Sequence, residues 1–341
     1  QSKSNKSVTI KRLESNESFK LLGVQVQLQG PMSANYQKIE AKARQLARRI
    51  KASSLSACAA DLAYNSVAMP QLQYSLLMTT YLDKDIEKIQ KPLTKAFLSR
   101  IGFNSQIARE VIYGPRKYGG YQLGHLPTNR GHDQIKYLMG HIRLQDPLGI
   151  MMEAVLAQAQ LFSGSGTHIL ENPSQDLSYL PDIWYKTIAT FLSSINASLV
   201  FKQGWKPSLQ RARDTYMMDD FRRHTTSPKL LERLNACRLY LHATTLADIC
   251  NASGTHIDRH HFDGTSLPLS SKVQWPYQPK PTTRMQKEWK SMLFRCYAND
   301  RATLELTQPL GAWQPSSISV YWPNLHHATS DTVFMRSISI T

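Results

Sequence analysis

A stripe of lysines in residues 84–101 has the spacing needed to neutralise a row of phosphates. Lys84, Lys88, Lys91 and Lys95 recur every three or four residues, so in a helix they fall within an arc of about 60°. The expected apolar face lies almost opposite and consists of Ile86, Ile89, Leu93 and Phe97. A stripe of one sign costs repulsion unless a counter-charge, such as a phosphate backbone, relieves it. The alternative is a solvated helical face, the usual meaning of a charge run. We favour nucleic-acid contact because compensating acids are scarce on this face.

A second basic face is expected in residues 35–51. Apolar residues recur there at spacings of three and four and define an arc of about 80° on a helical wheel: Tyr36, Ile39, Ala43, Leu46 and Ile50. The cations spread over the other side: Lys38, Lys42, Arg44, Arg48, Arg49 and Lys51. The same argument favours phosphate contact over a solvated face for Lys38, Lys42, Arg48 and Arg49.

A glycine-rich turn at Gly114–Gly120 carries two adjacent cations, Arg116 and Lys117. It lacks the Gly-Lys-Ser/Thr ending of a nucleoside-triphosphate loop. Tyrosines at 113, 118 and 121 bracket the cations, and such rings can stack on or clamp a nucleic acid. A plain surface turn is an equally good interpretation.

Residues 250–263 invite a zinc interpretation through the following side chains: Cys250, His256, Asp258, His260, His261 and Asp263. His256 and His260 have the i, i+4 spacing of two ligands on one helical face. However, no second cysteine is close, and Asn251 and Gly254 indicate a loop. We therefore assign no metal ligand and no catalytic residue in this chain.

Charge is the most informative part of the composition. The 341 residues include 41 Lys+Arg against 25 Asp+Glu, a net charge of +16 with a pI near 9.7. Such an excess favours a polyanionic partner. Four scattered cysteines argue against a disulfide framework and for a reducing compartment, the cytoplasm or nucleus. The apolar runs fall well short of the roughly 20 residues that a membrane helix needs.

Hydrophobic periodicity predicts a mostly α chain with a few short strands. Alternation over 19–28 predicts one half-buried strand that ends at Gly30-Pro31. Helices are expected over 35–51, 55–68, 70–81, 84–101, 129–143, 148–162, from Pro181 onward, and near 284–298. Ser53 or Ser54 and Asp83 are the expected helix caps. The best candidate boundary is the stretch from Gly164-Ser-Gly166 to Pro173.

Several motifs together resemble one family. Phe19-Lys-Leu-Leu-Gly-Val24 resembles the Leu-Gly strand that follows the polymerase palm in LINE-like, non-LTR retrotransposon reverse transcriptases. Further pieces follow in the family's order: Ser54-Leu-Ser56, Ala63-Tyr64, Pro70-Gln-Leu-Gln-Tyr74, Ile89-Gln-Lys-Pro92, Gly102-Phe-Asn104, Tyr113-Gly-Pro115, Gly119-Gly120 and Gln134-Ile135. Weaker similarity continues at Cys237-Arg-Leu-Tyr240, Trp275-Pro276 and Gly311-Ala-Trp313.

The resemblance implies that the parent protein is an RNA-directed DNA polymerase that uses Mg²⁺. Its catalytic aspartates would precede residue 1, so this segment alone is expected to be inactive and to hold no cofactor. The implied partners are an RNA–DNA or RNA template–primer duplex and the upstream palm of the same polypeptide. The implied parts are the palm end at 1–30, a thumb-like helical bundle at 31–110, connection helices at 111–165, a second helical domain at 166–265, and a Pro/Trp-rich α+β accessory region at 266–341.

One acidic pair imitates the polymerase motif. Tyr216-Met-Met-Asp219-Asp220 resembles the Tyr-X-Asp-Asp box but has one residue too many, and its flanks are charged. It also follows the Leu-Gly strand, which is the wrong order. We therefore expect a solvated helix or loop whose acids pair with neighbouring arginines.

Two other functions remain open. The chain could be a freestanding nucleic-acid-binding protein domesticated from such an element, or a zinc-dependent nuclease that uses residues 250–263. Because the sequence starts at Gln1 and shows no leader, we expect a fragment of a longer protein.

Overall fold

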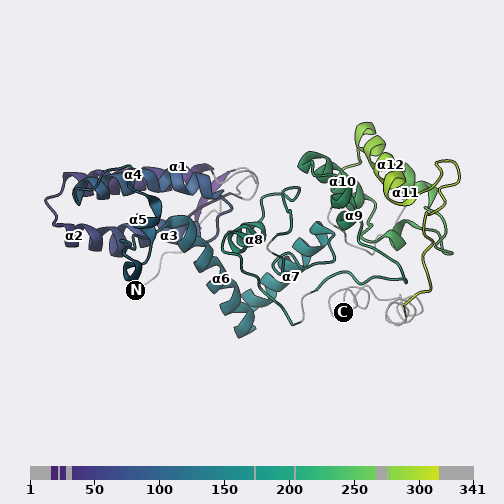
Figure 1. Cartoon of the computed structure of the whole chain (residues 1–341), viewed down its shortest axis with the longest axis horizontal. Helices are drawn as coiled ribbons and strands as arrows, with labels where there is room; N and C mark the ends of the chain where they lie inside the picture. Colours follow the sequence, from purple (N-terminus) through teal and green to yellow (C-terminus); the bar gives the residue numbers. More distant parts are fainter. Residues whose placement is uncertain are drawn as a thin grey trace, which may run out of the picture. The chain divides into compact units, whose positions relative to one another are not determined.

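The computed structural model describes residues 17–21, 24–27, 33–172, 174–202, 205–265, 275 and 277–314. The described chain is mostly helical, as the sequence predicted. It forms two compact units, Gln1–Tyr137 and Leu138–Thr341, called unit 1 and unit 2 (Figure 1). The division falls within helix α6 (Leu126–Leu144), not at the glycine–proline stretch. The finer five-part division of the sequence stays a prediction.

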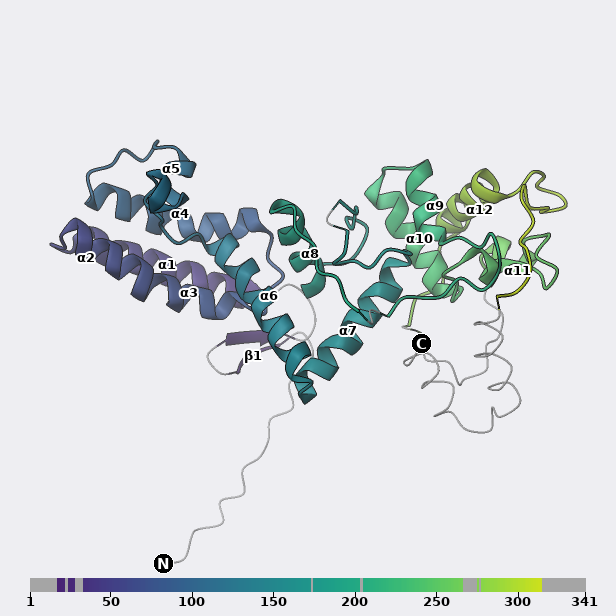
Figure 2. The ribbon, with the colours of Figure 1, turned by 60° about the horizontal axis from the view of Figure 1, so that its bottom comes forward.

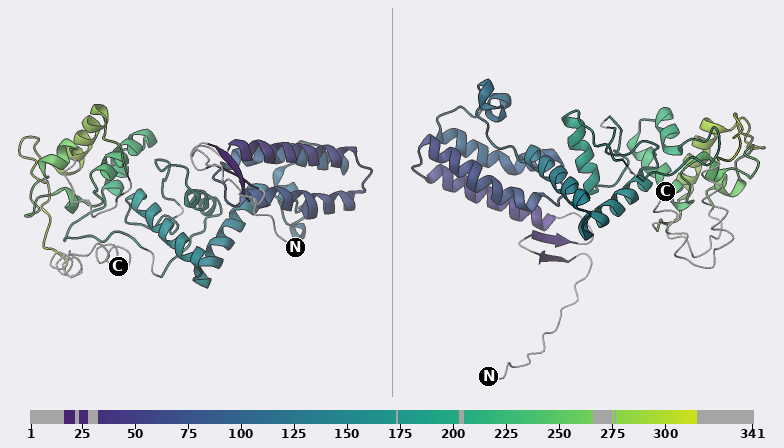
Figure 3. Two further views of the ribbon diagram at one scale, coloured as in Figure 1. Left: turned by 180° about the vertical axis from the view of Figure 1, so that it is seen from behind. Right: turned by 90° about the horizontal axis from the view of Figure 1, so that it is seen from below.

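Unit 1 begins with a β-hairpin where the sequence predicted a single strand. β1 (Ser18–Leu21) pairs antiparallel with β2 (Val24–Gln27), and Phe19 lies opposite Val26 (Figure 3). Residues of alternating polarity suit either arrangement, because the period of two is the same in one long strand and in two short ones. β2 lies against the first helix of the bundle.

Three long helical segments make up the bundle of unit 1 (Figure 2). They are α1 (Ser33–Ala52), the unbroken run of α2 (Ala57–Leu62), a π-helix (Ala63–Ala68) and α3 (Met69–Leu76), and α4 (Asp83–Arg100).

α1 and α4 lie side by side and run parallel. Near their starts, the Tyr36 hydroxyl donates to the Asp85 carbonyl at 3.4 Å. Near their ends, Arg100 Nε donates to the Leu55 carbonyl at 2.8 Å. The run between them therefore returns antiparallel to both.

Two helix starts differ from expectation. Ser56 caps α2, since its hydroxyl accepts from the Ala59 N–H at 3.2 Å, whereas the Ser53 hydroxyl donates to the Ile50 carbonyl. Asp83 is the first residue of α4 and caps nothing with its side chain. Its carboxylate instead accepts from the buried Arg130 of α6 at 2.6 Å. The serine difference is local, because the Ser53 hydroxyl bonds back to the end of α1. The Asp83 difference has a tertiary cause, a distant arginine that the sequence does not reveal.

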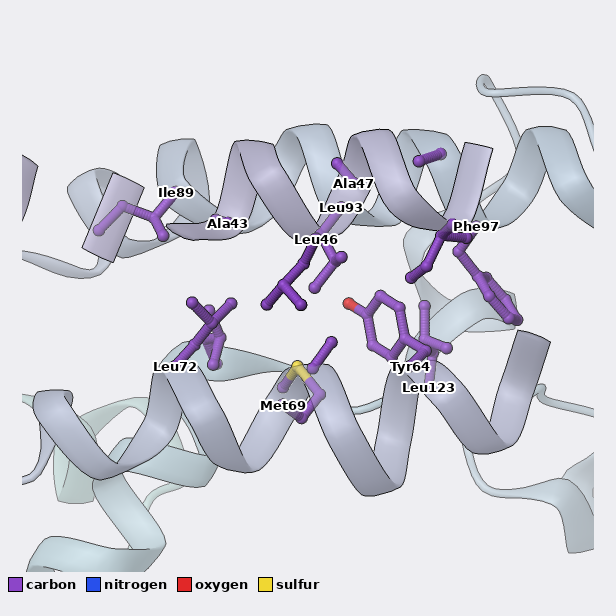
Figure 4. Close-up of a cluster of buried hydrophobic side chains, with 14 of the residues drawn as sticks. Ala43, Leu46, Ala47, Tyr64, Met69, Leu72, Ile89, Leu93, Phe97 and Leu123 are labelled. Carbon is purple, nitrogen blue, oxygen red and sulfur yellow. The ribbon is translucent and has the colours of Figure 1, made fainter. Parts of the chain in front are cut away.

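The predicted apolar arcs of α1 and α4 form the core. All four expected residues of α4 are fully buried: Ile86, Ile89, Leu93 and Phe97. Leu46 and Leu93 point toward Tyr64, Met69 and Leu72 of the returning run (Figure 4). The small, apolar composition of 55–68 favours a buried helix, but only one side of that run faces the bundle. Leu62 is 64% exposed and Val67 is 48% exposed.

A buried glutamine joins α4 to the start of α6. Gln90 Nε2 donates to the Gly124 carbonyl at 2.7 Å, and its Oε1 accepts from the Leu126 N–H at 2.8 Å. Gln90 Nε2 also donates to the hydroxyl of Tyr64, whose pKa is raised by burial. Because Gln90 is only 2% exposed, water cannot replace these bonds. We call this arrangement the Gln90 latch.

The glycine-rich turn follows a short helix, α5 (Arg109–Tyr113). The chain then folds back on itself, and the Gln122 N–H donates to the Gly114 carbonyl at 2.9 Å. A Cβ on Gly120 would lie 2.1 Å from that carbonyl oxygen. The turn therefore requires glycine at this position for close backbone approach.

Unit 2 contains shorter helices joined by long irregular segments. They are α7 (Pro147–Ser163), α8 (Trp184–Ser194), α9 (Met217–His224), α10 (Pro228–Tyr240), α11 (Arg259–Asp263) and α12 (Thr283–Tyr297). α8 begins three residues after Pro181, so that proline is not its first residue.

A buried arginine organises the centre of unit 2. Arg238 of α10 is fully buried, and its guanidinium donates to the carbonyls of Leu161, Phe162 and Ala243 at 2.8–3.1 Å. Burial lowers its pKa to about 10, so it stays charged at neutral pH. A Cβ on Gly164 would lie 2.7 Å from this guanidinium. The glycine stretch is therefore part of the packed interior and not an open linker.

The Gln90 latch predicts a stability effect. Gln90→Leu keeps the volume but leaves the Leu126 N–H and the Gly124 carbonyl without their amide partner, at roughly 1–3 kcal/mol for each buried group. We expect urea unfolding to show a loss of about 2–6 kcal/mol in total. Gln71→Leu, on the exposed side of α3, is the control and should change stability by less than about half a kcal/mol. Equal stabilities for the two variants would contradict the latch.

Candidate nucleic-acid interface

The excess positive charge belongs mostly to unit 1. Its residues 1–137 carry 21 Lys+Arg against 9 Asp+Glu, whereas residues 138–341 carry 20 against 16. The helical bundle is therefore strongly cationic, and unit 2 is nearly balanced. A polyanion is attracted to the part of a protein where the net positive charge is concentrated. In this chain that part is the bundle.

The four lysines of the α4 stripe are all exposed, opposite the buried face of the helix. The stripe is not of one sign throughout, because Lys88 Nζ lies 2.8 Å from the Asp85 carboxylate. That hydrogen bond and charge raise the pKa of Lys88. Lys84, Lys91 and Lys95 form no ion pair with any residue that the structure describes. These three lysines are open to an external anion.

The cations of α1 divide between two flanks. The pKa of Tyr36 is raised first by burial and then by Glu40 and Asp85, while Lys88 and Arg44 oppose the rise. Tyr36 bonds to Asp85 and Lys88 pairs with Asp85, so these three residues lie at the seam between α1 and α4. Glu40 and Arg44 follow Tyr36 at intervals of four on the same side of α1. Glu40 and Arg44 pair there at 2.8 Å.

Arg48 lies one turn beyond Arg44 and points almost directly away from the buried arc of α1, outward from the bundle as the α4 lysines do. Lys38, Lys42 and Arg49 project from the other flank of α1. On a helical wheel of α1 alone, all four predicted phosphate contacts of this helix share one polar face. The sequence could not separate them because it does not reveal on which side the neighbouring helix lies.

Arg48 and the α4 stripe therefore form one candidate surface. Tyr36 is level with Asp85, and both helices rise about 1.5 Å per residue, so Arg48 is level with the turn that carries Lys95. Arg48 is exposed and has no ion-pair partner within the described ranges. We call Arg48, Lys84, Lys91 and Lys95 the open cations, and their side chains can contact phosphates without first breaking an internal ion pair.

The two cations of the glycine-rich turn differ from each other. Arg116 lies 2.7 Å from the Asp61 carboxylate, so its charge is balanced internally. Lys117 is exposed, and its Nζ lies 4.7 Å from the centre of the Tyr118 ring. Tyr118 is 75% exposed and is available for stacking, whereas the Tyr121 ring packs edge-on against Phe97. The turn therefore offers one exposed cation that lies over one exposed ring, and no carboxylate that the structure describes neutralises this cation.

The imitation polymerase box lies in α9 and is only partly as expected. Asp219 pairs with Arg222, and Asp220 pairs with Arg223 at 2.7 Å, which confirms the predicted pairing with neighbouring arginines. The segment is not solvated, however. Asp220 is 7% exposed and accepts from the hydroxyl of Tyr297 at 2.8 Å. The two acids therefore join α9 to distant parts of unit 2, Asp219 to Ser165 and Gly166 and Asp220 to Tyr297.

Residues 250–263 have structural partners. The Asp258 side chain caps α11 by accepting from the backbone N–H of His260 at 2.8 Å. His256 forms a backbone bridge with Glu305, and Cys250 forms one with Ile257. Among the described residues, no group of three or more His, Cys, Asp or Glu side chains has the arrangement of a metal site.

Three tryptophans of the C-terminal region have internal contacts. Trp289 of α12 is fully buried, and its Nε1 donates to the His261 carbonyl at 2.9 Å. Trp275 stacks on His242 with 4.8 Å between the ring centres. The Arg211 guanidinium carbon lies 4.8 Å from the centre of the Trp313 ring. Trp322-Pro323 lies outside the described residues.

Comparisons with known proteins supply no relative: no family model, no curated protein and no solved structure matches the chain. Within the described ranges, no helix combines the length and apolar character needed to cross a membrane.

The two sides of α4 should respond oppositely to substitution. Leu93→Ala should cost about 2–5 kcal/mol, because Leu93 is fully buried and its truncation leaves a cavity. Lys91→Gln, two residues earlier on the exposed side, should stay within about half a kcal/mol of the wild type. Denaturant unfolding of both variants measures the contrast. A large loss with Lys91→Gln would show that the lysine stripe has a structural role.

Proposed function

We propose that this chain is the template–primer-gripping, C-terminal part of a retrotransposon RNA-directed DNA polymerase. The observation that carries the proposal is the set of open cations on two parallel helices of a rigid bundle. Each charge neutralised by a phosphate would release condensed counterions, which favours binding without sequence preference. In this proposal residues 31–110, the helical bundle of unit 1, correspond to the thumb, and the residues after 265 to the accessory tail.

The residues behind the family resemblance give the proposal a second support. Tyr64 and Gln90 belong to the Gln90 latch, and Gln134 donates to the Leu77 carbonyl at 3.0 Å. Gly120 permits the close backbone approach in the turn, and Arg238 organises unit 2. These motif residues thus build the framework, as expected if the resemblance reflects a shared fold and not a shared catalytic site.

In this proposal the palm and the bundle have different roles, catalysis and duplex binding. Polymerisation uses carboxylates on adjacent strands to hold two metal ions about 4 Å apart, and in this proposal the upstream palm supplies them with Mg²⁺. The bundle holds the duplex by its phosphates, a contact that reads shape and not sequence. The chain alone should therefore bind duplex and extend no primer, and the complete polymerase would act in the cytoplasm or nucleus.

Salt dependence of duplex binding tests the phosphate grip. The purified chain should bind a blunt RNA–DNA duplex with a steep negative slope of log K against log salt. Changing Arg48, Lys84, Lys91 and Lys95 to Gln should weaken binding and reduce that slope by roughly one unit per lost phosphate contact. Thermal melts should show both proteins folded.

A matched control distinguishes binding at the bundle surface from a general effect of the net charge of the protein. Lys229, Lys280, Lys287 and Arg295 are exposed cations of unit 2. Their fourfold change to Gln removes the same net charge and should leave the affinity and the slope nearly unchanged. Equal losses for the two fourfold variants would mean that net charge, and not the bundle surface, drives binding.

A further inference from the structure

A pocket opens on unit 1 between the returning helical run and the glycine-rich turn. Its volume is about 720 Å³, within the range of small-ligand sites. It is lined by Cys58, Asp61, Leu62, Asn65, Ser66, Arg116, Gly120 and Tyr121. We call it the turn pocket. The open cations project from α1 and α4, and none of them lines it.

Both walls of the turn pocket are fixed by hydrogen bonds. Asn65 and Ser66 stand on the π-helix, a local form that recurs at functional sites. The Asn65 side chain accepts from the Gly124 N–H at 3.0 Å and donates to Asp61 at 2.8 Å. The opposite wall is held by the close backbone approach at Gly120. A ligand would therefore meet a preformed shape.

The charges of the turn pocket cancel. Asp61 and Arg116 pair at 2.7 Å across it, so the cavity carries no free charge that would select a phosphate. The paired groups still present unused lone pairs on the carboxylate and unused N–H donors on the guanidinium. Such a cavity suits a neutral ring with donors and acceptors on its edge.

Two hydroxyls and one apolar side chain add further contact groups to the turn pocket. Neither the Ser66 hydroxyl nor the Tyr121 hydroxyl has a hydrogen-bond partner in the described part of the chain. Burial, and then Asp61, raise the pKa of Tyr121, so its hydroxyl stays protonated and can donate. Edge-on contacts with Phe97 and Phe103 fix the ring. Leu62, 64% exposed at the rim, offers an apolar surface for a flat ligand.

We propose that the turn pocket binds one unpaired nucleobase of the nucleic acid held by unit 1. The base edge meets Asp61, Ser66 and Arg116, and its face lies against Leu62. Lys117, exposed next to Arg116 in sequence, contacts the adjoining phosphate. The inference rests on the proposed function and deepens it, since it assigns a single-stranded segment to a site separate from the duplex surface.

The test compares two probes on the full chain. One is a blunt RNA–DNA duplex, and the other is the same duplex with a short single-stranded template overhang that carries 2-aminopurine. The overhang should bind about tenfold more tightly, because the unpaired base adds hydrogen bonds at its edge and an apolar contact with Leu62 that the blunt duplex lacks. Its fluorescence should change on binding as the base leaves its stacked state.

Ser66→Trp fills the pocket from an exposed helical position, and Gln71→Trp places the same ring on the same helical run outside the pocket. Ser66→Trp should abolish the overhang advantage and the fluorescence change, with blunt-duplex affinity unchanged. Gln71→Trp should retain both. Equal affinity of the wild type for the two probes, or an overhang advantage that survives in Ser66→Trp, would overturn the pocket. Failure of blunt-duplex binding in the wild type would instead overturn the proposed function.

Discussion

The parallel packing of α1 against α4 is the constraint on which the rest of unit 1 depends. Two parallel neighbours require a connection that returns the full length of the bundle, and the unbroken run Ala57–Leu76 supplies it. At about 1.5 Å per residue these twenty residues span roughly 30 Å. The apolar arcs of all three segments are buried in the shared core, so the lysines and arginines of these segments face outward.

The same packing decides which cations act together. The seam between α1 and α4 contains two internal ion pairs, Glu40–Arg44 and Asp85–Lys88, and these pairs leave Arg48, Lys91 and Lys95 without an anion. Exposed pairs of this kind contribute little to stability. Their main consequence is to distinguish cations that are already neutralised from cations that an external phosphate can neutralise.

Helical periodicity predicted much of this bundle, because a core-facing arc repeats every 3.6 residues and can be identified without a structure. Ile86, Ile89, Leu93 and Phe97 are buried as expected. The Gln90 latch was not predictable, since a glutamine between apolar residues gives no sign of the distant carbonyl that it binds. The turn pocket could not be predicted for a related reason. Asp61 and Arg116 are 55 residues apart, and only the fold brings them together.

Unit 2 shows the limit of sequence patterns more strongly. Its irregular segments are held by buried charged side chains, and Arg211 donates to the Gly311, Ala252 and Ser253 carbonyls at 2.9–3.1 Å. A buried arginine that binds carbonyls replaces the hydrogen bonds of regular structure. In sequence it is indistinguishable from a surface cation, which is why a charge run around Asp219 and Asp220 was expected to be solvated.

Lysine footprinting can show whether the duplex lies on the lysine stripe of α4. The chain would be acetylated briefly at low salt with and without a blunt RNA–DNA duplex, and each lysine would be quantified by mass spectrometry. The account predicts that duplex protects Lys84, Lys91 and Lys95 severalfold, while Lys229 and Lys287 of unit 2 react at unchanged rates. Protection spread equally over both units, or confined to unit 2, would contradict it.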